Sequence, residues 1–276
     1  MFDEILACVD GSSLAEKILP LARGITAPGG GRLTLLRVVR DTAELAAEEG
    51  YLRDCARQYS AELRFLVSSD PAQTIGAELA RDPRAIAALT THGRTAWAEA
   101  ILGSVTLRVI RESKRPVIVF RPREDECNVP EKITTVAVAL DGGDFSEKMV
   151  RHAVKAAQFL SAHLLLLQAL PVLPQRPASE NDPKPGLVES SYLHRKAADI
   201  KAAYGIDAQW EVLHGEPADA LRRYLNDMPE TMLAMTTHGR GPIERTVLGQ
   251  CRRSLCAPRP RSIAALLAAL ITKDEG

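Results

Sequence analysis

The chain has 276 residues, room for about two domains, and its 46% hydrophobic and 25% charged content is that of an ordinary globular protein. The formal net charge is zero, so no overall field favours nucleic acid or an anionic membrane as a partner. No run of 18 apolar residues predicts a membrane span, and the acidic start MFDEILACVD lacks the basic region of an export signal. Five cysteines without CxxC spacing favour free thiols, so we expect a cytoplasmic protein.

Short apolar runs alternate with helical patterns through the first half. The predicted strands, each suited to burial on both faces of a parallel sheet, are 4–9, 32–39, 62–67, 85–90 and 116–120. The predicted helices between them are 13–24, 43–60, 72–81 and 104–113. Ser12 or Ser13 can cap the first helix, and Asp70 can cap the third before Pro71. This alternation predicts βαβ units and a doubly wound parallel sheet.

The second half repeats the first. ILACVDGSS near the start aligns with VAVALDGGD at 136–144, and the THGR motif with its later glycine also occurs twice. The Pro-rich stretch at 171–186 accounts for the extra residues of the second copy and has the composition of a loop. The aligned pairs are Asp10 with Asp141, at an offset of 131, and His92, Gly93 and Gly103 with His238, Gly239 and Gly249, at an offset of 146.

We therefore predict an α/β protein of two tandem, doubly wound, Rossmann-like domains, each a five-stranded parallel sheet flanked by helices. The first domain would span 1–122, the linker 123–132 and the second domain 133–276, with the loop insertion 171–186. The second domain has an atypical C-terminus. Pro258 and Pro260 interrupt the helix expected there, and the Ala- and Leu-rich run that replaces the last strand has the composition of a helix.

Right-handed crossovers place the carboxyl ends of all parallel strands at one edge of each sheet, where ligands usually bind. Asp10 ends the first strand, and Gly103-Ser104 opens the helix after the fourth. A helix N-terminus suits phosphate, and a carboxylate can accept hydrogen bonds from ribose hydroxyls. These residues predict a nucleotide cleft.

Each of these signals also has a purely structural reading. Gly103-Ser104 can be no more than a helix start, Asp10 a helix cap, and His92 a partner of loop backbone groups. The fixed spacing, present twice in one chain and placed at strand ends, is what favours the ligand-binding interpretation.

At these motifs the sequence resembles the universal stress protein family in its tandem form, over nearly the whole chain. The resemblance rests on ILACVDGSS, DPAQTI, THGRTAWAEAILGSV and RPVIVF in the first half, and on VAVALDGGD, HGEPADAL and THGRGPIERTVLG in the second. ATP-binding members carry Gly-x2-Gly-x9-Gly-(Ser/Thr). Here Gly93 and Gly103-Ser104 keep that spacing, whereas Thr90 stands in place of the first glycine. The resemblance implies the nucleotide-binding HUP type of the fold, with ATP and an accompanying Mg²⁺ or Mn²⁺.

The resemblance also assigns the ligand contacts. Adenine would meet the backbone of Val38, with Cys8 and Asp10 beside base and ribose. The site in the first domain would consist of Cys8, Asp10, Val38, Thr90, His92, Gly93, Gly103, Ser104, Val105 and Thr106. The second site departs more from the family pattern, because Gln250 replaces the hydroxyl residue, and we expect it to be weaker. It would consist of Asp141, Ala169, Thr236, His238, Gly239, Gly249 and Gln250.

We find no catalytic constellation, P-loop or metal cluster in the sequence, so we predict no catalytic residues and no metal ligands of the protein itself. His92 and Asp10 acting on a water would give slow ATP hydrolysis at most. The leading hypothesis is an ATP-binding stress-response or signalling module. The alternatives are a non-nucleotide interaction protein with vestigial clefts, and an enzyme of the wider α-hydrolase-like class, which lacks support because the SGGxDS loop is missing.

The family's fifth strands commonly pair at a dimer interface, and PVIVF at 116–120 is a suitable edge. In a tandem chain the two domains would pair within one molecule, as an intramolecular pseudo-dimer. A further homodimer stays open.

Overall fold

The computed structural model describes residues 3–90, 104–113, 115–122, 131–171, 185–236 and 263–268. The elements of the first repeat are β1 (Glu4–Val9), α1 (Ser13–Glu16), α2 (Ile18–Gly29), β2 (Arg32–Val39), α3 (Thr42–Gln58), β3 (Glu62–Val67), α4 (Pro71–Arg81), β4 (Ala85–Thr90), α5 (Ser104–Ser113) and β5 (Pro116–Arg121). The elements of the second are β6 (Thr135–Leu140), α6 (Asp144–Leu160), β7 (His163–Leu170), α7 (Pro185–Tyr204), β8 (Ala208–His214), α8 (Pro217–Asn226), β9 (Thr231–Thr236) and β10 (Ile263–Ala268).

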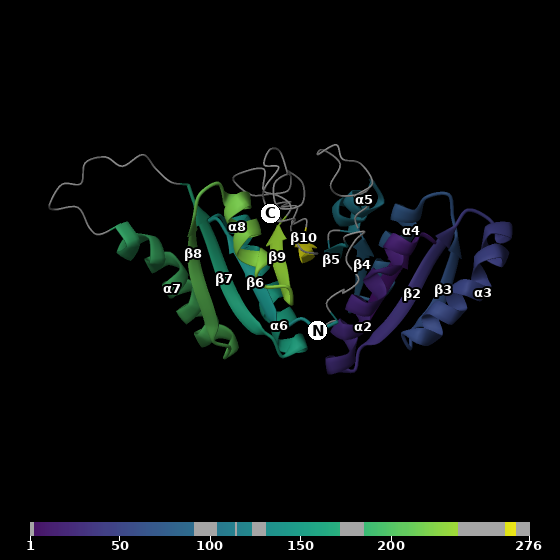
Figure 1. The fold of residues 1–276 in the computed structure, drawn as a ribbon, viewed down its shortest axis with the longest axis horizontal. Helices are drawn as coiled ribbons and strands as arrows, with labels where there is room; N and C mark the ends of the chain where they lie inside the picture. Colours follow the sequence, from purple (N-terminus) through teal and green to yellow (C-terminus); the bar gives the residue numbers. More distant parts are fainter. Residues whose placement is uncertain are drawn as a thin grey trace, which may run out of the picture.

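These strands form one continuous sheet in the order β3-β2-β1-β4-β5-β10-β9-β6-β7-β8 (Figure 1). Within each repeat the five strands are parallel, so the predicted doubly wound fold is confirmed. The carboxyl ends of β1, β2 and β4 therefore lie at one edge of the first half-sheet, as the site prediction requires.

The two half-sheets join where β5 and β10 pair in antiparallel register, from Ile263 opposite Arg121 to Ala268 opposite Pro116. The expected pairing of the fifth strands within one chain is thus present. The Ala- and Leu-rich run left open a helix at the C-terminus, but residues 263–268 are a strand between β5 and β9, which completes the five strands predicted for the second domain. Two available strand edges override the helix preference of Ala and Leu, as tertiary context often does.

Apolar side chains fill both faces of the sheet, because successive residues of a strand point to opposite sides. On one face the core cluster that contains Ile5 and Ala7 of β1 includes residues of α2, α3, α6 and α7. On the other face the cluster that contains Leu6 and Cys8 includes residues of α4, α5 and α8. Both core clusters contain residues of both repeats, so on each face of the sheet the hydrophobic core extends over the two halves.

The segment that enters the second repeat passes directly over α2. A Cβ built on Gly24 would overlap the carbonyl oxygen of Glu131, so only glycine fits at this crossing.

The exact domain boundaries at 122 and 133 stay predictions, as does the extent of the insertion 171–186, most of which lies outside the described residues.

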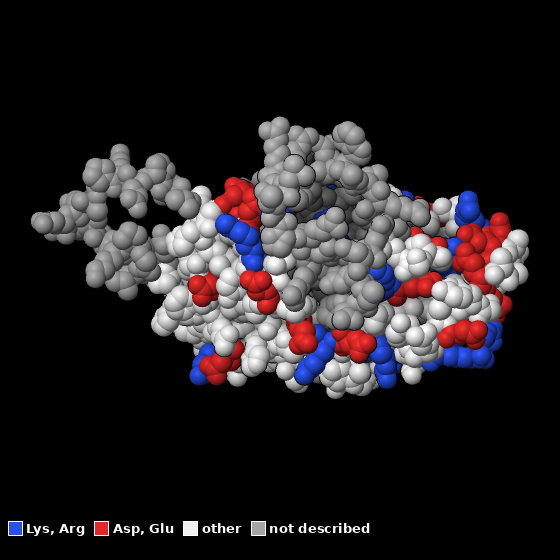
Figure 2. Space-filling view, viewed as in Figure 1, with Lys and Arg blue, Asp and Glu red and all other residues white. Residues whose placement is uncertain are grey.

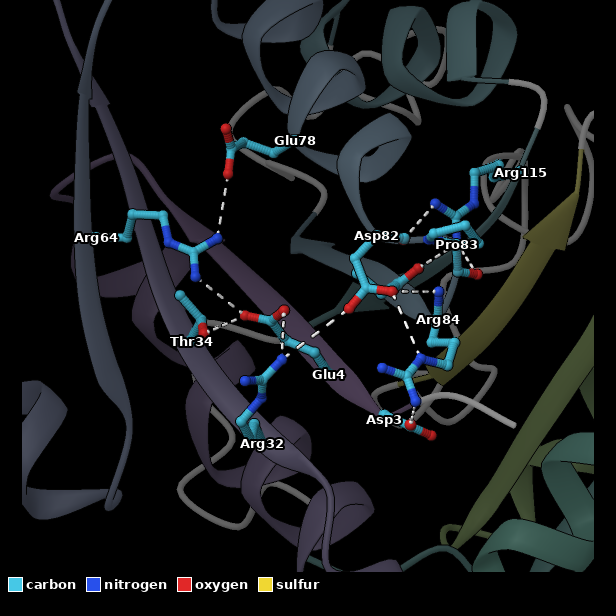
Figure 3. A network of polar contacts seen from close by, with 11 residues as sticks. Asp3, Glu4, Arg32, Thr34, Arg64, Glu78, Asp82, Pro83, Arg84 and Arg115 are labelled. Carbon is cyan, nitrogen blue, oxygen red and sulfur yellow. Dashed lines mark hydrogen bonds and ion pairs between the residues drawn. The ribbon is translucent and has the colours of Figure 1, made fainter.

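A network of charged side chains holds the amino ends of the first-repeat strands (Figure 3). Glu4 of β1, 4% exposed, accepts from the Thr34 hydroxyl at 2.6 Å and from Arg64 at 3.3 Å. Arg64 also pairs with Glu78 of α4 at 3.1 Å. Nearby, the Arg115 guanidinium donates to the carbonyls of Leu79, Asp82, Pro83 and Ala85. This network lies at the sheet edge opposite the predicted ligand edge and ties α4 to the strands.

The face of the molecule in Figure 2 carries acidic and basic side chains mixed together, with no broad area of one sign among the described residues. That pattern accords with the formal net charge of zero.

Candidate functional site

The loop after β1 holds the Asp10 carboxylate at the carboxyl edge of the sheet. Its Oδ1 accepts from the backbone N–H of Ser12 at 3.0 Å, which closes a turn around Gly11. Gly11 has φ of +79°, a left-handed conformation that favours glycine. The helix cap is Ser12, whose Oγ accepts from the N–H of Ala15 at 3.1 Å. Asp10 thus shapes the turn and does not cap α1.

A cavity of about 390 Å³ opens at this edge, between the ends of β1, β2 and β4 and the first turns of α4 and α5. The structure brings together every predicted first-site residue that it describes. Those that line the cavity are Cys8, Asp10, Val38, Thr90, Ser104, Val105 and Thr106. The remaining predicted residues, His92, Gly93 and Gly103, lie outside the described residues.

The two ends of the cavity differ in chemistry. Near β2 its wall is apolar, with Leu36 and Val38 facing Ile75 of α4. Near β4 and α5 it is lined by Thr90, Ser104 and Thr106, three residues with hydroxyl groups. An elongated ligand with one flat apolar end and one anionic end fits this polarity, since the N-terminus of α5 adds the positive end of a helix dipole.

Two of these hydroxyls lack a hydrogen-bond partner within the described part of the chain. Thr90 is 6% exposed and Thr106 only 3%, yet neither side chain forms a hydrogen bond to another described residue. A buried hydroxyl without a partner costs about 1–3 kcal/mol. A ligand that supplies acceptor oxygens would remove that cost, so these residues fit a phosphate group.

Cys8 forms part of the cavity wall as a neutral thiol. Burial raises its pKa to about 12, and its Sγ donates to the Leu6 carbonyl at 3.5 Å. Because the thiolate is the reactive form, this cysteine is an apolar contact and not a nucleophile.

The N-terminus of α5 is held in place by an ion pair with α4. The Arg108 guanidinium binds Asp70 in bidentate fashion, with Nη1–Oδ1 of 3.0 Å and Nη2–Oδ2 of 2.8 Å. Asp70 also accepts from the N–H of Gln73 at 3.1 Å, which confirms the predicted cap of α4. The Arg108 hydrogen bonds hold the pKa of Asp70 below its usual range.

The sequence analysis missed Arg37, which also lines the cavity and is only 8% exposed. Its guanidinium pairs with Glu48 at 2.6 Å and with Glu44 at 2.8 Å, both on α3. A signal was available: Arg37 interrupts the apolar run that follows Arg32, and Glu44 and Glu48 come next in the chain, four positions apart.

In the second repeat the structure describes Asp141, Ala169 and Thr236 of the predicted site, at the ends of β6, β7 and β9. Asp141 repeats the turn, accepting from the N–H of Gly143 at 2.9 Å, but its Oδ1 also accepts from the Ser146 hydroxyl at 2.5 Å. The other predicted residues, His238, Gly239, Gly249 and Gln250, lie outside the described residues.

Within the described ranges, no three His, Cys, Asp or Glu side chains gather as a metal site. Of the helices described, none is long and apolar enough to cross a membrane.

The universal stress protein family model matches residues 44–121 and 132–255, more than half of the chain and both repeats. The protein belongs to the universal stress protein family. A search of curated proteins returned no match.

Solved structures of universal stress proteins share this fold at low sequence identity. One from Archaeoglobus fulgidus superposes with a TM-score of 0.67 at 14% identity, covering 97% of this chain and 98% of that one. Another, assigned to the family in Pseudomonas aeruginosa, gives 0.60 at 18% identity, with 96% and 93% covered. The cytoplasmic domain of a prokaryotic cation chloride cotransporter gives 0.57 at 10% identity, with 97% and 96% covered. At these identities the likeness concerns the tandem fold alone.

Proposed function

We propose that the protein is a nucleotide-dependent stress-response or signalling module whose first repeat binds an adenine nucleotide, ATP foremost. The observation that carries this proposal is the pair of buried hydroxyls, Thr90 and Thr106, which face a cavity without a partner among the described residues. The phosphates would lie at these hydroxyls and at the start of α5, and Asp10 would accept from the ribose hydroxyls.

The residues present fit the nucleotide and its cation in different ways. Hydroxyls and a helix N-terminus suit the phosphates, and the phosphates themselves would carry a Mg²⁺ or Mn²⁺ ion, since the described residues offer no three-ligand metal site. The cavity of about 390 Å³ lies within the usual range of small-molecule sites. We expect ATP hydrolysis to be slow at most, and the cytoplasm to be the compartment.

The test is ATP binding measured by titration calorimetry with Mg²⁺, together with release of nucleotide from the freshly purified protein. Thr106→Val keeps the shape of a buried side chain but removes the hydroxyl, and we expect it to weaken ATP binding about tenfold while the fold persists. Thr90→Val should weaken binding in the same way, and Thr236→Val, at the position of the second repeat that corresponds to Thr90, is its matched control and should leave this affinity unchanged. If the unaltered protein binds no ATP at millimolar concentration, the alternative of an interaction protein with vestigial clefts takes its place.

A further inference from the structure

Arg37 lies at the apolar end of the cavity, where the base of a bound nucleotide would be. The residues with hydroxyl groups and the start of α5 are at the β4–α5 end, so a nucleotide with its phosphates there extends its base toward β2. At that end the wall includes Val38, near the end of β2, whose only hydrogen-bonding groups are those of its backbone. A base that meets Val38 is therefore recognised through the backbone.

The Val38 carbonyl lies just past the end of the pairing between β1 and β2. The carbonyl of Val39 accepts from the N–H of Ser68 at 2.8 Å, so it points toward β3, and the preceding carbonyl, that of Val38, points toward β1. The strand β1 ends at Val9, opposite Arg37, so it offers no further strand residue to hold this carbonyl. A carbonyl at such a strand end needs another donor if it is to keep a fixed direction.

Arg37 supplies that donor. Its Nη1 donates to the Val38 carbonyl oxygen at 2.7 Å in a buried hydrogen bond. The guanidinium itself is fixed by α3, because Nε donates to Glu48 Oε2 at 2.6 Å and Nη2 donates to Glu48 Oε1 at 2.9 Å and to Glu44 Oε1 at 2.8 Å. A carbonyl oxygen has two lone pairs, so the bond from Arg37 fixes the direction of the Val38 carbonyl and leaves one lone pair for a ligand.

The same ion pair reaches the turn that carries Asp10. Glu48 Oε1 lies 3.1 Å from the position that a Cβ at Gly11 would take, so the carboxylate packs against this turn. Asp10, which directly precedes Gly11, also lines the cavity. The pair of Arg37 and Glu48 thus connects the base end of the cleft with the proposed ribose contact.

We infer that Arg37 is a positioning residue for the base: it holds the Val38 carbonyl as an acceptor for the 6-amino group of adenine, and Glu48 ties this contact to the Asp10 turn. The inference rests on the proposed nucleotide site and names what recognises the base there. An amino group at position 6 donates to the second lone pair of the carbonyl, whereas a purine without that group leaves the lone pair unfilled. Arg37 acts through Val38 and does not itself need to touch the base.

The second repeat forms the same turn without this ion pair. Gly142, the counterpart of Gly11, has φ of +73°, yet no described atom lies within 4 Å of a Cβ built there. Gln168 stands at the place of Arg37, opposite Leu140 on β6. Neither the turn nor the strand pairing therefore requires a buried arginine, which favours a role for Arg37 at the cavity.

The experiment compares the dissociation constants of ATP and of purine riboside triphosphate, which lacks only the 6-amino group, for the full chain with Mg²⁺. We expect the unaltered protein to bind ATP about tenfold more tightly, and Arg37→Met to reduce this preference to about twofold, because the Val38 carbonyl is no longer held. A purely structural role of Arg37 would weaken the binding of both nucleotides equally and leave the ratio of the two constants unchanged.

Two further variants separate positioning from stability. Arg37→Met leaves the Glu48 carboxylate without its cation, so Arg37→Met/Glu48→Leu, which removes both charges, is measured beside it and should show the same low preference. Arg64→Met is the matched control, because Arg64 bridges the buried carboxylates of Glu4 and Glu78 at the other edge of the sheet. It should lower the stability of the protein and leave the preference for ATP unchanged.

Equal binding of the two nucleotides by the unaltered protein overturns the inference whether or not the variants fold, and so does a preference for ATP that persists in either Arg37 variant. An equal loss of preference in Arg64→Met also overturns it, because the preference would then follow stability and not the contact with Val38. If neither nucleotide binds to the unaltered protein at millimolar concentration, the proposed function itself fails.

Discussion

The two repeats have the same turn at the ligand edge but use its carboxylate differently. Gly11 and Gly142 have φ of +79° and +73°, and each follows the aspartate that ends the first strand of its repeat. One turn into the helix, however, the first repeat has Ala15, and the second has Ser146, whose hydroxyl donates to Asp141 at 2.5 Å. Ala15 lines the cavity and has no hydroxyl to donate. At this position, therefore, only the second repeat has a hydroxyl that donates to its aspartate.

A second contact is common to both repeats. Glu16 accepts from the Tyr51 hydroxyl at 2.7 Å, and its counterpart Glu147 accepts from the Tyr192 hydroxyl at 3.0 Å and from Lys196 at 3.1 Å. The helices after the second strand are therefore attached to the first helix in the same way. The scaffold has been kept while the residues at the cavity have diverged.

The repeats also differ at the opposite edge of the sheet. The Glu4–Thr34 pair in the first corresponds to Thr135 and Leu165 in the second, so the second repeat begins its strands without this charged network. The first repeat should therefore depend on buried charges for stability where the second depends on apolar packing.

The largest expected effect tests that difference. Glu4→Ala removes the buried carboxylate that accepts from the Thr34 hydroxyl and from Arg64 Nη2. We expect a loss of about 3 kcal/mol in the free energy of unfolding. Thr135→Ala, at the matched position, should cost less than about 1 kcal/mol. Urea unfolding followed by circular dichroism measures both. Equal losses would show that the network contributes no more than an ordinary strand residue.

The next effect concerns the two aspartates. Asp10→Asn removes the charge that would accept from ribose hydroxyls, and we expect ATP affinity to fall about thirtyfold, whereas Asp141→Asn should change it less than about twofold. Titration calorimetry with Mg²⁺ gives both constants. A similar fall for both variants would mean that the second repeat contributes equally to binding.

A smaller effect follows from exchanging the residues that differ. Ala15→Ser places in the first repeat the hydroxyl that occupies Asp141 in the second, and we expect it to weaken ATP binding about fivefold. Ser146→Ala is the reciprocal change and should leave the first site unaffected. If Ala15→Ser binds ATP as tightly as the unaltered protein, the hydroxyl does not compete for the carboxylate.

Much of this comparison could be predicted from the sequence because it depends on local patterns. The strands of the first repeat and the cap at Asp70 follow from periodicity and turn chemistry. The clustering of Cys8, Val38 and Thr106 was implied by the resemblance to the universal stress protein family. Residues 263–268 could not be assigned, because their strand conformation depends on β5 and β9, which are distant in sequence. The role of Arg37 was also missed, because only the tertiary packing of α3 shows that its charge is paired inside the cavity wall.

The last prediction concerns the reactivity of Cys8, whose matched position is Ala139; the two residues are 9% and 8% exposed. With the other four cysteines changed to serine, we expect Cys8 to react with iodoacetamide about a thousandfold more slowly than an ordinary thiol, because burial raises its pKa from 9.0 to about 12. The thiolate is the form present at high pH, so the rate should rise about tenfold per pH unit with no plateau below pH 10.

Moving the thiol to the second repeat turns this measurement into a comparison of the two clefts. In Cys8→Ala/Ala139→Cys the thiol has matched burial, so its basal rate should be as slow. ATP should slow the reaction further only when the thiol is at position 8, beside the proposed base. Protection at position 139 instead would place nucleotide in the second repeat and reverse the order of the two sites, while a plateau near pH 9 would show that the wall around Cys8 is open to water.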